Sequence, residues 1–365
     1  MTDRWPERVW YGDSLASRAA RAALAPASWV YAGVTMLRSK AYDAGLLRSV
    51  TPSLPTLGVG NLSVGGTGKT PVAAWAASQL LAAGAQPAIV LRGYGDDEPL
   101  VHQRLNPSAV VIADADRVRG VATARAAGAD CAILDDAFQH RRVRRMENWL
   151  LVAAEQWRAV ERCLPAGPLR EPPSAMVRAT LIAVTRKSGP RELAEDVASR
   201  LKEHAPDIPV AILHLAPDGL RSVHGASSEP LSRLAGARIL AIAAIGAPQE
   251  FFAQLSHSGA RVDEAPYRDH HAFGAQDVAS LARRGAGCDV VVCTLKDAVK
   301  LAPLWPQNGP PLWYVSQRAV VERGREVLDG SLRTILAARV GAAPTAGSAG
   351  PDSIDHGHRS STADQ

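Results

Sequence analysis

Short apolar runs alternate along the chain with segments long enough to form helices. Such runs, bounded by turn-forming residues, are typical of strands that are buried on both faces. The first set of expected strands is Leu57–Gly60, Ala88–Leu91, Val110–Ala113, Cys131–Leu134, Leu150–Ala153, Leu181–Thr185 and Val210–Leu213. The second set is Ile239–Ile245, Asp289–Thr294 and Leu312–Val315, with helices expected at Gln249–Ser256 and Ala275–Arg283. Strands separated by helices predict an α/β protein with a parallel sheet covered on both faces.

Residues 14–45 predict a long helix with two unlike faces. Its apolar centre, Ala22–Leu37, is only 16 residues long and contains Pro26, which is short for a membrane-spanning helix. The positions on the basic face are Arg18, Arg21, Ser28, Thr35 and Arg38. The apolar positions elsewhere on the helix are Trp29, Val30, Val34 and Leu37. We therefore expect a basic amphipathic helix that lies in a membrane interface, the alternative being a helix packed on the protein's own surface.

These patterns predict four parts of the chain. Residues 1–50 form a membrane-associated helical segment, and prolines at positions 52 and 55 mark the break after it. Residues 51–218 form a parallel-sheet domain of the P-loop NTPase type, and residues 219–340 a smaller second α/β domain. Residues 341–365 contain almost no large apolar side chain and are expected to be disordered.

The stretch Gly60–Pro71, with the sequence GNLSVGGTGKTP, stands between an expected strand and an expected helix. This is the context of a phosphate-binding loop, in which glycines let successive N–H groups converge on an anion. Ser63 stands where the strict pattern has glycine, and a chance glycine-rich turn is the alternative. The residues expected to bind nucleotide phosphates are Ser63, Val64, Gly65, Gly66, Thr67, Gly68, Lys69 and Thr70. Lys69 would reach the β- and γ-phosphates and the Thr70 hydroxyl would bind Mg²⁺.

The segment Cys131–His140, CAILDDAFQH, is a buried strand that ends in two carboxylates. In phosphate-loop enzymes a carboxylate at the end of a neighbouring strand holds Mg²⁺, so Asp135 or Asp136 can complete the site begun by Thr70. The alternative is a pair of aspartates that caps the next helix.

Acidic residues also follow the second expected strand, in Arg92–Pro99, RGYGDDEP. A carboxylate at this edge of the sheet could accept the proton of a substrate hydroxyl, although a solvated acidic loop is the simpler interpretation. In the second half, at most one of His270 and His271 is expected to face a cleft.

Three further segments have more open interpretations. The arginines of His140–Arg145, HRRVRR, suit phosphate recognition or form a solvated basic face. Leu164–Pro172, LPAGPLREP, reads as an ordered loop without a defined task. Thr294–Leu301, TLKDAVKL, places Lys296 and Asp297 at the edge of the sheet or simply starts a helix.

Composition and charge narrow the class of protein. The chain has 365 residues, of which 47% are hydrophobic and 21% charged, as in folded proteins that are soluble or bound to a membrane surface. The net charge of +5 favours anionic partners such as phosphates or acidic lipids. No recognised nucleic-acid-binding motif is present, and no nucleic-acid partner is expected. Four scattered cysteines, with no C-x-x-C pair, indicate reduced thiols in the cytosol.

Taken together, the ordered motifs resemble the tetraacyldisaccharide 4′-kinase family of the lipid A pathway. The matching segments, within residues 8–302, are WYGDS, GNLSVGGTGKTP, RGYG, DEP, DDAFQH, LPAGPLREP, IGAPQEFFAQL, RDHHAF and TLKDAVKL. The resemblance implies ATP-dependent, Mg²⁺-assisted phosphorylation of the 4′-hydroxyl of tetraacyldisaccharide 1-phosphate at the cytoplasmic face of the inner membrane. It also implies two α/β/α domains with the nucleotide between them.

The resemblance carries residue roles to matching positions. It implies that Asp97 is the base, supported by His270, and that Asp135 and Asp136 are the carboxylates associated with Mg²⁺. The segment between RGYG and DEP is shorter here than is usual in the family, so Asp96 remains an alternative to Asp97. Ala137 replaces a usual glycine, and Leu295 replaces a common glutamate.

Two other functions remain open from the sequence. One is a regulatory P-loop NTPase whose nucleotide state switches a partner interaction. The other is a family member that has lost activity with its shortened loop. Acyl-chain preference and oligomeric state are not determined by the sequence.

Overall fold

The computed structural model describes residues 5–93, 97–157 and 162–339. The helices are α1 (Trp5–Tyr11), α2 (Leu15–Asp43), α3 (Lys69–Ala82), α4 (Asp97–Leu105), α5 (Arg117–Ala126), α6 (Arg191–His204), α7 (Pro248–His257), α8 (Ala275–Gly285), α9 (Leu295–Leu301) and α10 (Arg325–Ala337). The strands are β1 (Thr56–Asn61), β2 (Pro87–Leu91), β3 (Val110–Ala113), β4 (Cys131–Asp135), β5 (Glu147–Ala153), β6 (Leu181–Arg186), β7 (Val210–Ser222), β8 (Ser228–Glu229), β9 (Arg238–Ala243), β10 (Arg261–Pro266), β11 (Val290–Thr294) and β12 (Leu312–Arg323). The predicted tail at 341–365 lies outside the described residues.

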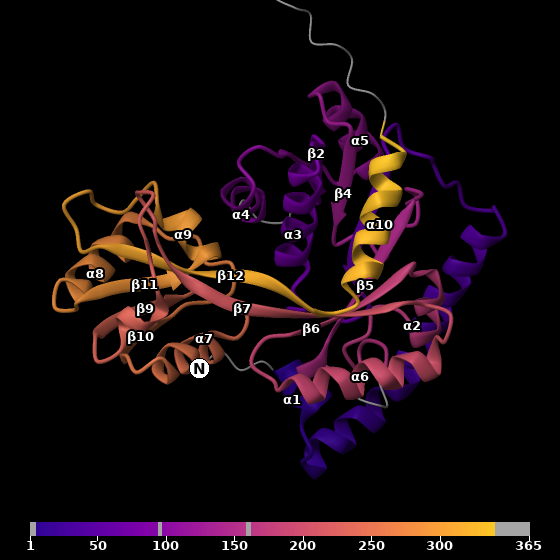
Figure 1. The fold of residues 1–365 in the computed structure, drawn as a ribbon. Helices are drawn as coiled ribbons and strands as arrows, with labels where there is room; N and C mark the ends of the chain where they lie inside the picture. Colours follow the sequence, from indigo (N-terminus) through magenta and orange to yellow (C-terminus); the bar gives the residue numbers. More distant parts are fainter. Residues whose placement is uncertain (1–4, 94–96, 158–161, 340–365) are drawn as a thin grey trace, which may run out of the picture.

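A single mixed sheet runs through the whole molecule (Figure 1). Its strand order is β10-β9-β11-β12-β7-β6-β5-β1-β4-β2-β3, with β8 beside β7. Each expected strand is present, and most neighbours pair in parallel as predicted. The sheet is not parallel throughout, however, because the long strands β7 and β12 pair antiparallel.

Strands β7 and β12 link the two halves of the sheet, and each contributes to both halves (Figure 1). The predicted domain boundary at residue 218 stays a prediction, and it falls inside β7. After β12, helix α10 returns to the first half and packs on α3. The last part of the chain therefore packs into the first half of the molecule, which the sequence pattern did not reveal.

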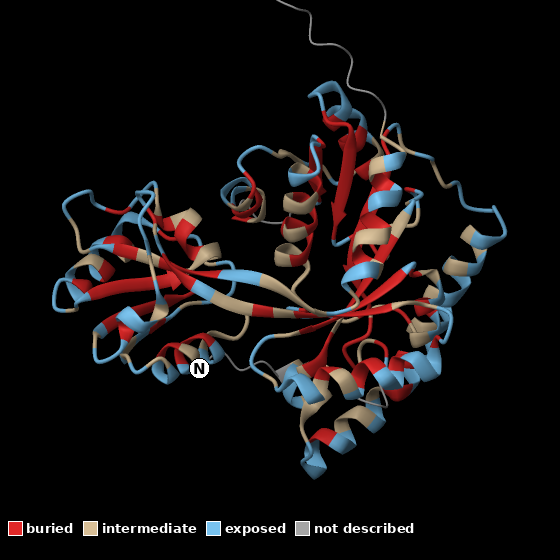
Figure 2. Ribbon diagram, in the orientation of Figure 1, coloured by how far each residue is buried: buried red, intermediate tan, exposed pale blue. Residues whose placement is uncertain are grey.

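Helices cover both faces of the sheet in each half, and buried residues lie between the layers (Figure 2). In the first half, α3 and α10 pack on one face and α5 and α6 on the other. In the second half, α8 and α9 cover one face and α7 the other. This arrangement confirms the predicted α/β class with three layers.

Helix α2 is attached to the body of the protein by its polar face. Ser28 is buried and its hydroxyl donates to the Cys163 carbonyl, while Arg21 donates to the carbonyls of Val9 (2.6 Å) and Gly12 (2.7 Å). The guanidinium of Arg21, one of the residues on the predicted basic face, is therefore used for contacts within the chain.

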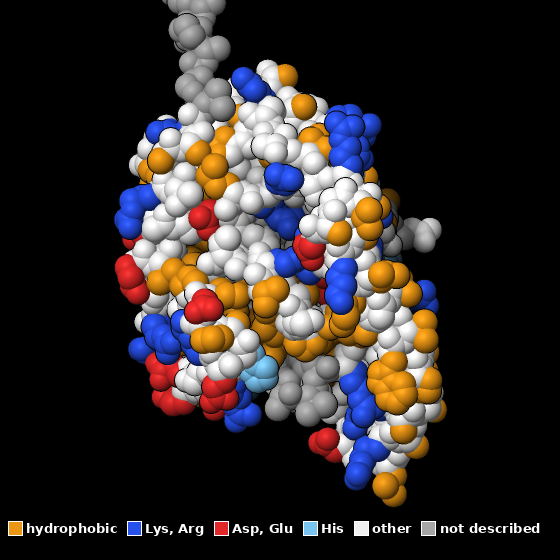
Figure 3. All heavy atoms as spheres, turned by 90° about the vertical axis from the view of Figure 1, so that its right-hand side faces the viewer, with side chains coloured by type: hydrophobic (Ala, Val, Ile, Leu, Met, Phe, Trp, Pro, Cys, Tyr) orange, Lys and Arg blue, Asp and Glu red, His pale blue; other side chains and the backbone are white. Residues whose placement is uncertain are grey.

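The apolar face of α2 points away from the protein. Trp29 is 73% exposed and Leu37 69% exposed, and Val30 and Val34 are exposed beside them. Figure 3, which views the side of the molecule where α2 lies, shows hydrophobic side chains gathered beside Lys and Arg side chains. Among the described residues, no helix has both the length and the apolar character needed to cross a membrane.

Helix α10 offers a direct test of this packing. Leu328 is fully buried between α10 and the sheet, so Leu328→Ala is expected to lower the free energy of unfolding by about 2–5 kcal/mol. Urea unfolding would measure the change. Leu304→Ala, at an exposed position, is the control and should change it by about 0.5 kcal/mol or less. Equal small effects for both variants would show that α10 is not docked as described.

Candidate functional site

The glycine-rich loop connects β1 to α3, as the sequence predicts. Gly65 and Gly68 have positive φ values of 126° and 83°, which side chains other than glycine rarely adopt. A Cβ on Gly68 would also lie 2.2 Å from Leu215 Cδ1. The loop therefore needs glycine at this position for both backbone conformation and space.

The predicted loop residues lie together at the carboxyl end of β1. Val64, Gly65 and Gly66 are exposed, whereas Thr67 is buried. The Thr67 hydroxyl has no hydrogen-bond partner among the described residues. Ser63 pairs with Leu169 of the LPAGPLREP segment in an isolated bridge, so this segment lies beside the glycine-rich loop.

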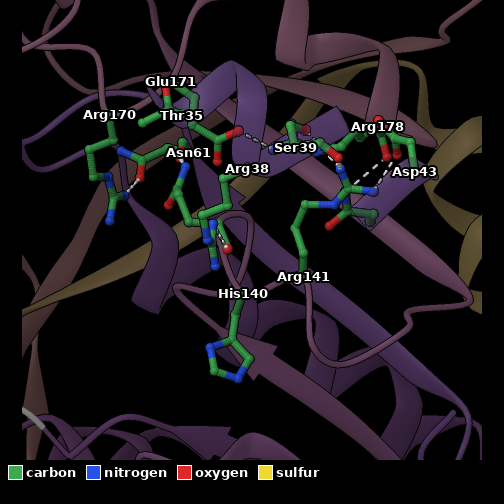
Figure 4. A network of polar contacts seen from close by, with 12 residues as sticks. Thr35, Arg38, Ser39, Asp43, Asn61, His140, Arg141, Arg170, Glu171 and Arg178 are labelled. Atoms are coloured by element: carbon green, nitrogen blue, oxygen red, sulfur yellow. Dashed lines mark hydrogen bonds and ion pairs between the residues drawn. The ribbon is translucent and has the colours of Figure 1, made fainter. Parts of the chain in front are cut away.

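Lys69, at the start of α3, belongs to a cluster of charges at the base of the loop. Its Nζ donates to Asn61 Oδ1 at 3.2 Å and lies 3.6 Å from Asp136 Oδ1. Arg170 donates to both Asp136 oxygens, at 2.9 and 3.2 Å. It also donates to Asn61, which lies beside it in Figure 4. Burial alone would raise the pKa of Asp136, but the charges of Lys69 and Arg170 outweigh it and hold the pKa below its ordinary value.

Asp135 and Asp136 end β4 side by side but point in different directions. The Asp135 carboxylate accepts from the Asp136 N–H at 2.8 Å, and its other oxygen lies 2.9 Å from Nε2 of the fully buried His102. Thr70 lies in the first turn of α3, and no hydrogen bond within the described residues joins its hydroxyl to either aspartate. The two carboxylates and this hydroxyl are oxygen donors of the kind that Mg²⁺ prefers.

Asp97 of the first half of the molecule contacts His270 of the second half. Asp97 is the first residue of α4 and is only 3% exposed, while His270 comes from the segment between β10 and α8. His270 Nδ1 lies 3.3 Å from Asp97 Oδ1 and 3.2 Å from Oδ2. The structure thus pairs two residues that are 173 positions apart in the sequence. Asp96, the alternative base, lies outside the described residues.

His271 points elsewhere, as expected for one of two adjacent histidines. Its Nε2 lies 3.0 Å from Asp277 Oδ2, and its ring packs against those of Tyr267 and Phe273. His271 is therefore part of the packing of the second half.

A second contact between the two halves joins Glu98 of α4 to Lys296 of α9, with Nζ 3.8 Å from Oε1. Burial raises the pKa of Glu98, and the charge of Lys296 opposes that rise. Lys296 of the TLKDAVKL segment lies in the first turn of α9, directly after the carboxyl end of β11, so both interpretations of this segment describe the structure.

The arginine-rich segment after the aspartates is mainly used inside the protein. Arg141 pairs with Asp43 of α2 at 2.5 Å (Figure 4), and Arg142 pairs with Asp116 at 3.0 Å. Arg145 donates to the carbonyls of Ala137 and His140. The prediction that these arginines recognise phosphate is not supported for the three that have such partners.

His140 provides a pH-dependence test of this region. Burial, together with the charges of Arg117 and Arg145, lowers its pKa to about 4. In the unfolded chain the ring has a pKa of about 6.5, so the unfolded state binds more protons between these values and stability falls as pH falls through this window.

Because the ring is partly accessible, we expect His140 to account for about 1–2 kcal/mol of the loss in unfolding free energy between pH 7 and pH 5. His140→Gln should lose correspondingly less stability over the same interval. Urea unfolding at the two pH values measures the difference, and parallel losses in both proteins would contradict the assignment.

Sequence reasoning missed several members of the site. Asn61 contacts both Lys69 and Arg170, and His102 contacts Asp135. Arg117 is buried at the start of α5 and donates to the Asp135 carbonyl at 3.4 Å. Asn61 had a signal, since it is a polar residue at the end of a buried strand beside the loop. His102 and Arg117 had none, because their contacts depend on how helices pack against β4.

Comparison with known proteins gives consistent matches. A family model described as tetraacyldisaccharide-1-P 4′-kinase matches residues 20–99 and 95–337. The tetraacyldisaccharide 4′-kinase of Geobacter metallireducens is 36% identical over 79% of this chain and 90% of its own length. That of Halorhodospira halophila is 35% identical over 84% of this chain and 90% of its own length.

A solved structure is similar in fold as well. A crystal structure of LpxK from Aquifex aeolicus in complex with ATP aligns with a TM-score of 0.68 at 26% sequence identity. The alignment covers 87% of this chain and 99% of that one.

Proposed function

The chain belongs to the tetraacyldisaccharide 4′-kinase family, and from this we propose that it transfers the γ-phosphate of ATP to the 4′-hydroxyl of tetraacyldisaccharide 1-phosphate in lipid A biosynthesis. The pairing of Asp97 in the first half with His270 in the second half is the observation that carries this proposal. A nucleotide switch needs no such pair beyond its phosphate loop, whereas a kinase needs a group that accepts the proton of its second substrate.

The glycine-rich loop between β1 and α3 fits the polyphosphate of ATP. The positive φ of Gly65 and Gly68 shapes the loop, and the buried Thr67 hydroxyl lacks a protein partner among the described residues. Lys69 is held near the loop by Asn61 and Asp136, where it binds the β- and γ-phosphates.

Thr70, Asp135 and Asp136 would hold Mg²⁺, which neutralises charge on the phosphates when it is bound. The donor set suits this ion, because Mg²⁺ is usually held by one or two carboxylates together with phosphate oxygens and water. His102 and the Asp136 N–H fix the Asp135 carboxylate. The charges of Lys69 and Arg170 keep Asp136 ionised.

At the acceptor end, Asp97 takes the proton of the 4′-hydroxyl as its oxygen attacks the γ-phosphorus. The bond from that phosphorus to the ADP oxygen breaks, and ADP leaves. The His270 ring, which comes from the second half of the molecule, orients the Asp97 carboxylate. Because Asp97 is almost fully buried, few waters compete with the acceptor hydroxyl for it.

The exposed apolar face of α2 supports peripheral association with the cytoplasmic face of the inner membrane, where a lipid disaccharide would be presented. Trp29, Val30, Val34 and Leu37 would lie at the level of the acyl chains. The opposite face of the helix is fixed to the protein through Ser28 and Arg21. Helix α2 thereby holds the catalytic residues near the membrane surface.

The test is a transfer assay with purified protein in detergent, labelled ATP, Mg²⁺ and tetraacyldisaccharide 1-phosphate. Label is expected at the 4′ position of the lipid, with no transfer when the lipid is omitted. ATP hydrolysis that does not depend on the lipid would instead indicate the regulatory NTPase. Folded protein that binds ATP but transfers nothing would overturn the proposed activity.

A further inference from the structure

The segment that carries His270 has no helix or strand of its own. It lies between β10 and α8, and His270 has a φ of +57°, in the left-handed region. A residue other than glycine pays for this conformation and adopts it stably only when its surroundings impose it. The groups that impose this backbone conformation on His270 therefore also set the position of its ring beside Asp97.

One of these groups is the carboxylate of Asp297, which is fully buried in the first turn of α9. Its Oδ2 accepts from the Ala244 N–H at 3.0 Å and from the Thr294 hydroxyl at 2.7 Å. The carbonyl of Ala244 in turn accepts from the His270 N–H at 3.2 Å. A continuous path of hydrogen bonds thus leads from Asp297 through one residue to the backbone of His270.

The second group is the ammonium of Lys300, one turn further along α9. Its Nζ donates to the His271 carbonyl at 3.1 Å and lies 3.3 Å from Asp297 Oδ1. It also lies 5.2 Å from the centre of the Phe273 ring. Lys300 therefore holds the backbone at His271, directly after His270, and forms an ion pair with the buried Asp297 carboxylate.

We propose that Asp297 and Lys300 are positioning residues for phosphoryl transfer: they fix the backbone on both sides of His270 so that its ring reaches Asp97 in the other half of the molecule. This role rests on the proposed kinase function. It is argued from contacts in this structure: the Lys300 side chain contacts the backbone of the His270 segment directly, and the Asp297 side chain contacts it through Ala244.

The test is a double-mutant cycle with His270. Asp297→Asn and Lys300→Met are each expected to lower kcat about 10- to 100-fold, with KM for both substrates within about threefold of the wild type. In a His270→Ala background, each change should lower kcat by less than about twofold, because the residue it acts through is already gone.

Asp289→Asn is the matched control. Asp289 accepts from the Arg238 N–H at 2.7 Å, which is the same kind of contact at the opposite end of β9 and β11. This variant should leave kcat unchanged. Thermal unfolding and ATP binding establish that each variant is folded, and Lys300→Met retains the test if Asp297→Asn does not fold.

Histidine-selective NMR adds a readout that does not depend on activity. The ring signals of His270, identified by their loss in His270→Ala, should shift in Lys300→Met and Asp297→Asn but not in Asp289→Asn. Losses of kcat that multiply in the double variants, or unmoved ring signals, would overturn the positioning role. Absence of transfer by the wild type would count against the proposed function instead, and the ring signals would still decide the positioning role.

Discussion

Asp97→Asn is expected to lower kcat for transfer to the lipid about 10²- to 10⁴-fold, because the amide cannot accept the proton of the acceptor hydroxyl. The substitution keeps the size of the buried side chain, and ATP binding should stay within about twofold of the wild type. Steady-state transfer with saturating ATP measures kcat, and calorimetric titration measures nucleotide affinity.

Two comparison variants sharpen this result. Asp96→Asn tests the neighbouring carboxylate, which the sequence alone left as an alternative. Asp114→Asn is the control, since Asp114 follows the adjacent strand β3 but is held by Arg119 on the surface. A large loss in Asp96→Asn with a normal rate in Asp97→Asn would move the base to Asp96. Equal losses in Asp97→Asn and Asp114→Asn would point to a general effect of removing acidic residues.

The local pattern of the sequence was sufficient to predict most of the fold. Strands such as Cys131–Asp135 are buried on both faces, so their apolar runs are continuous and easy to recognise. The edge strand Arg261–Pro266 was missed because exposed polar residues interrupt it. The extension of β7 and β12 was missed for a related reason, since their central parts cross between the halves where burial changes along the strand.

The site could be predicted only where the chemistry is local in sequence. The glycine-rich loop and the Asp135–Asp136 pair each lie within one short segment, and the structure places them together. The support of Asp97 by His270 entered through the family resemblance, because spacing cannot show that two segments so far apart in the sequence come into contact. His102 illustrates the remaining limit, since only the packing of α4 against β4 brings its ring to Asp135.

Lys69→Met is the second change with a large expected effect. Lys69 follows the glycine-rich loop directly and is paired with Asp136, and Arg170 remains beside that carboxylate when the lysine is lost. Removing one preorganised charge that stabilises the transferring phosphoryl group is expected to lower kcat about 10²- to 10³-fold. Binding of Mg·ATP should weaken as well, because Lys69 contacts the phosphates in the ground state.

The same transfer assay and titration measure both effects. Lys202→Met is the control, because Lys202 is exposed on α6 and, within the part of the chain that the structure describes, donates only to the Pro206 carbonyl. It should change neither kcat nor affinity, although it removes the same charge from the protein. If Lys69→Met kept a normal rate, the transferring phosphate would have to be stabilised by other cations such as Arg170, and the loop would only anchor the nucleotide. A loss of affinity with kcat unchanged would assign Lys69 to nucleotide binding alone.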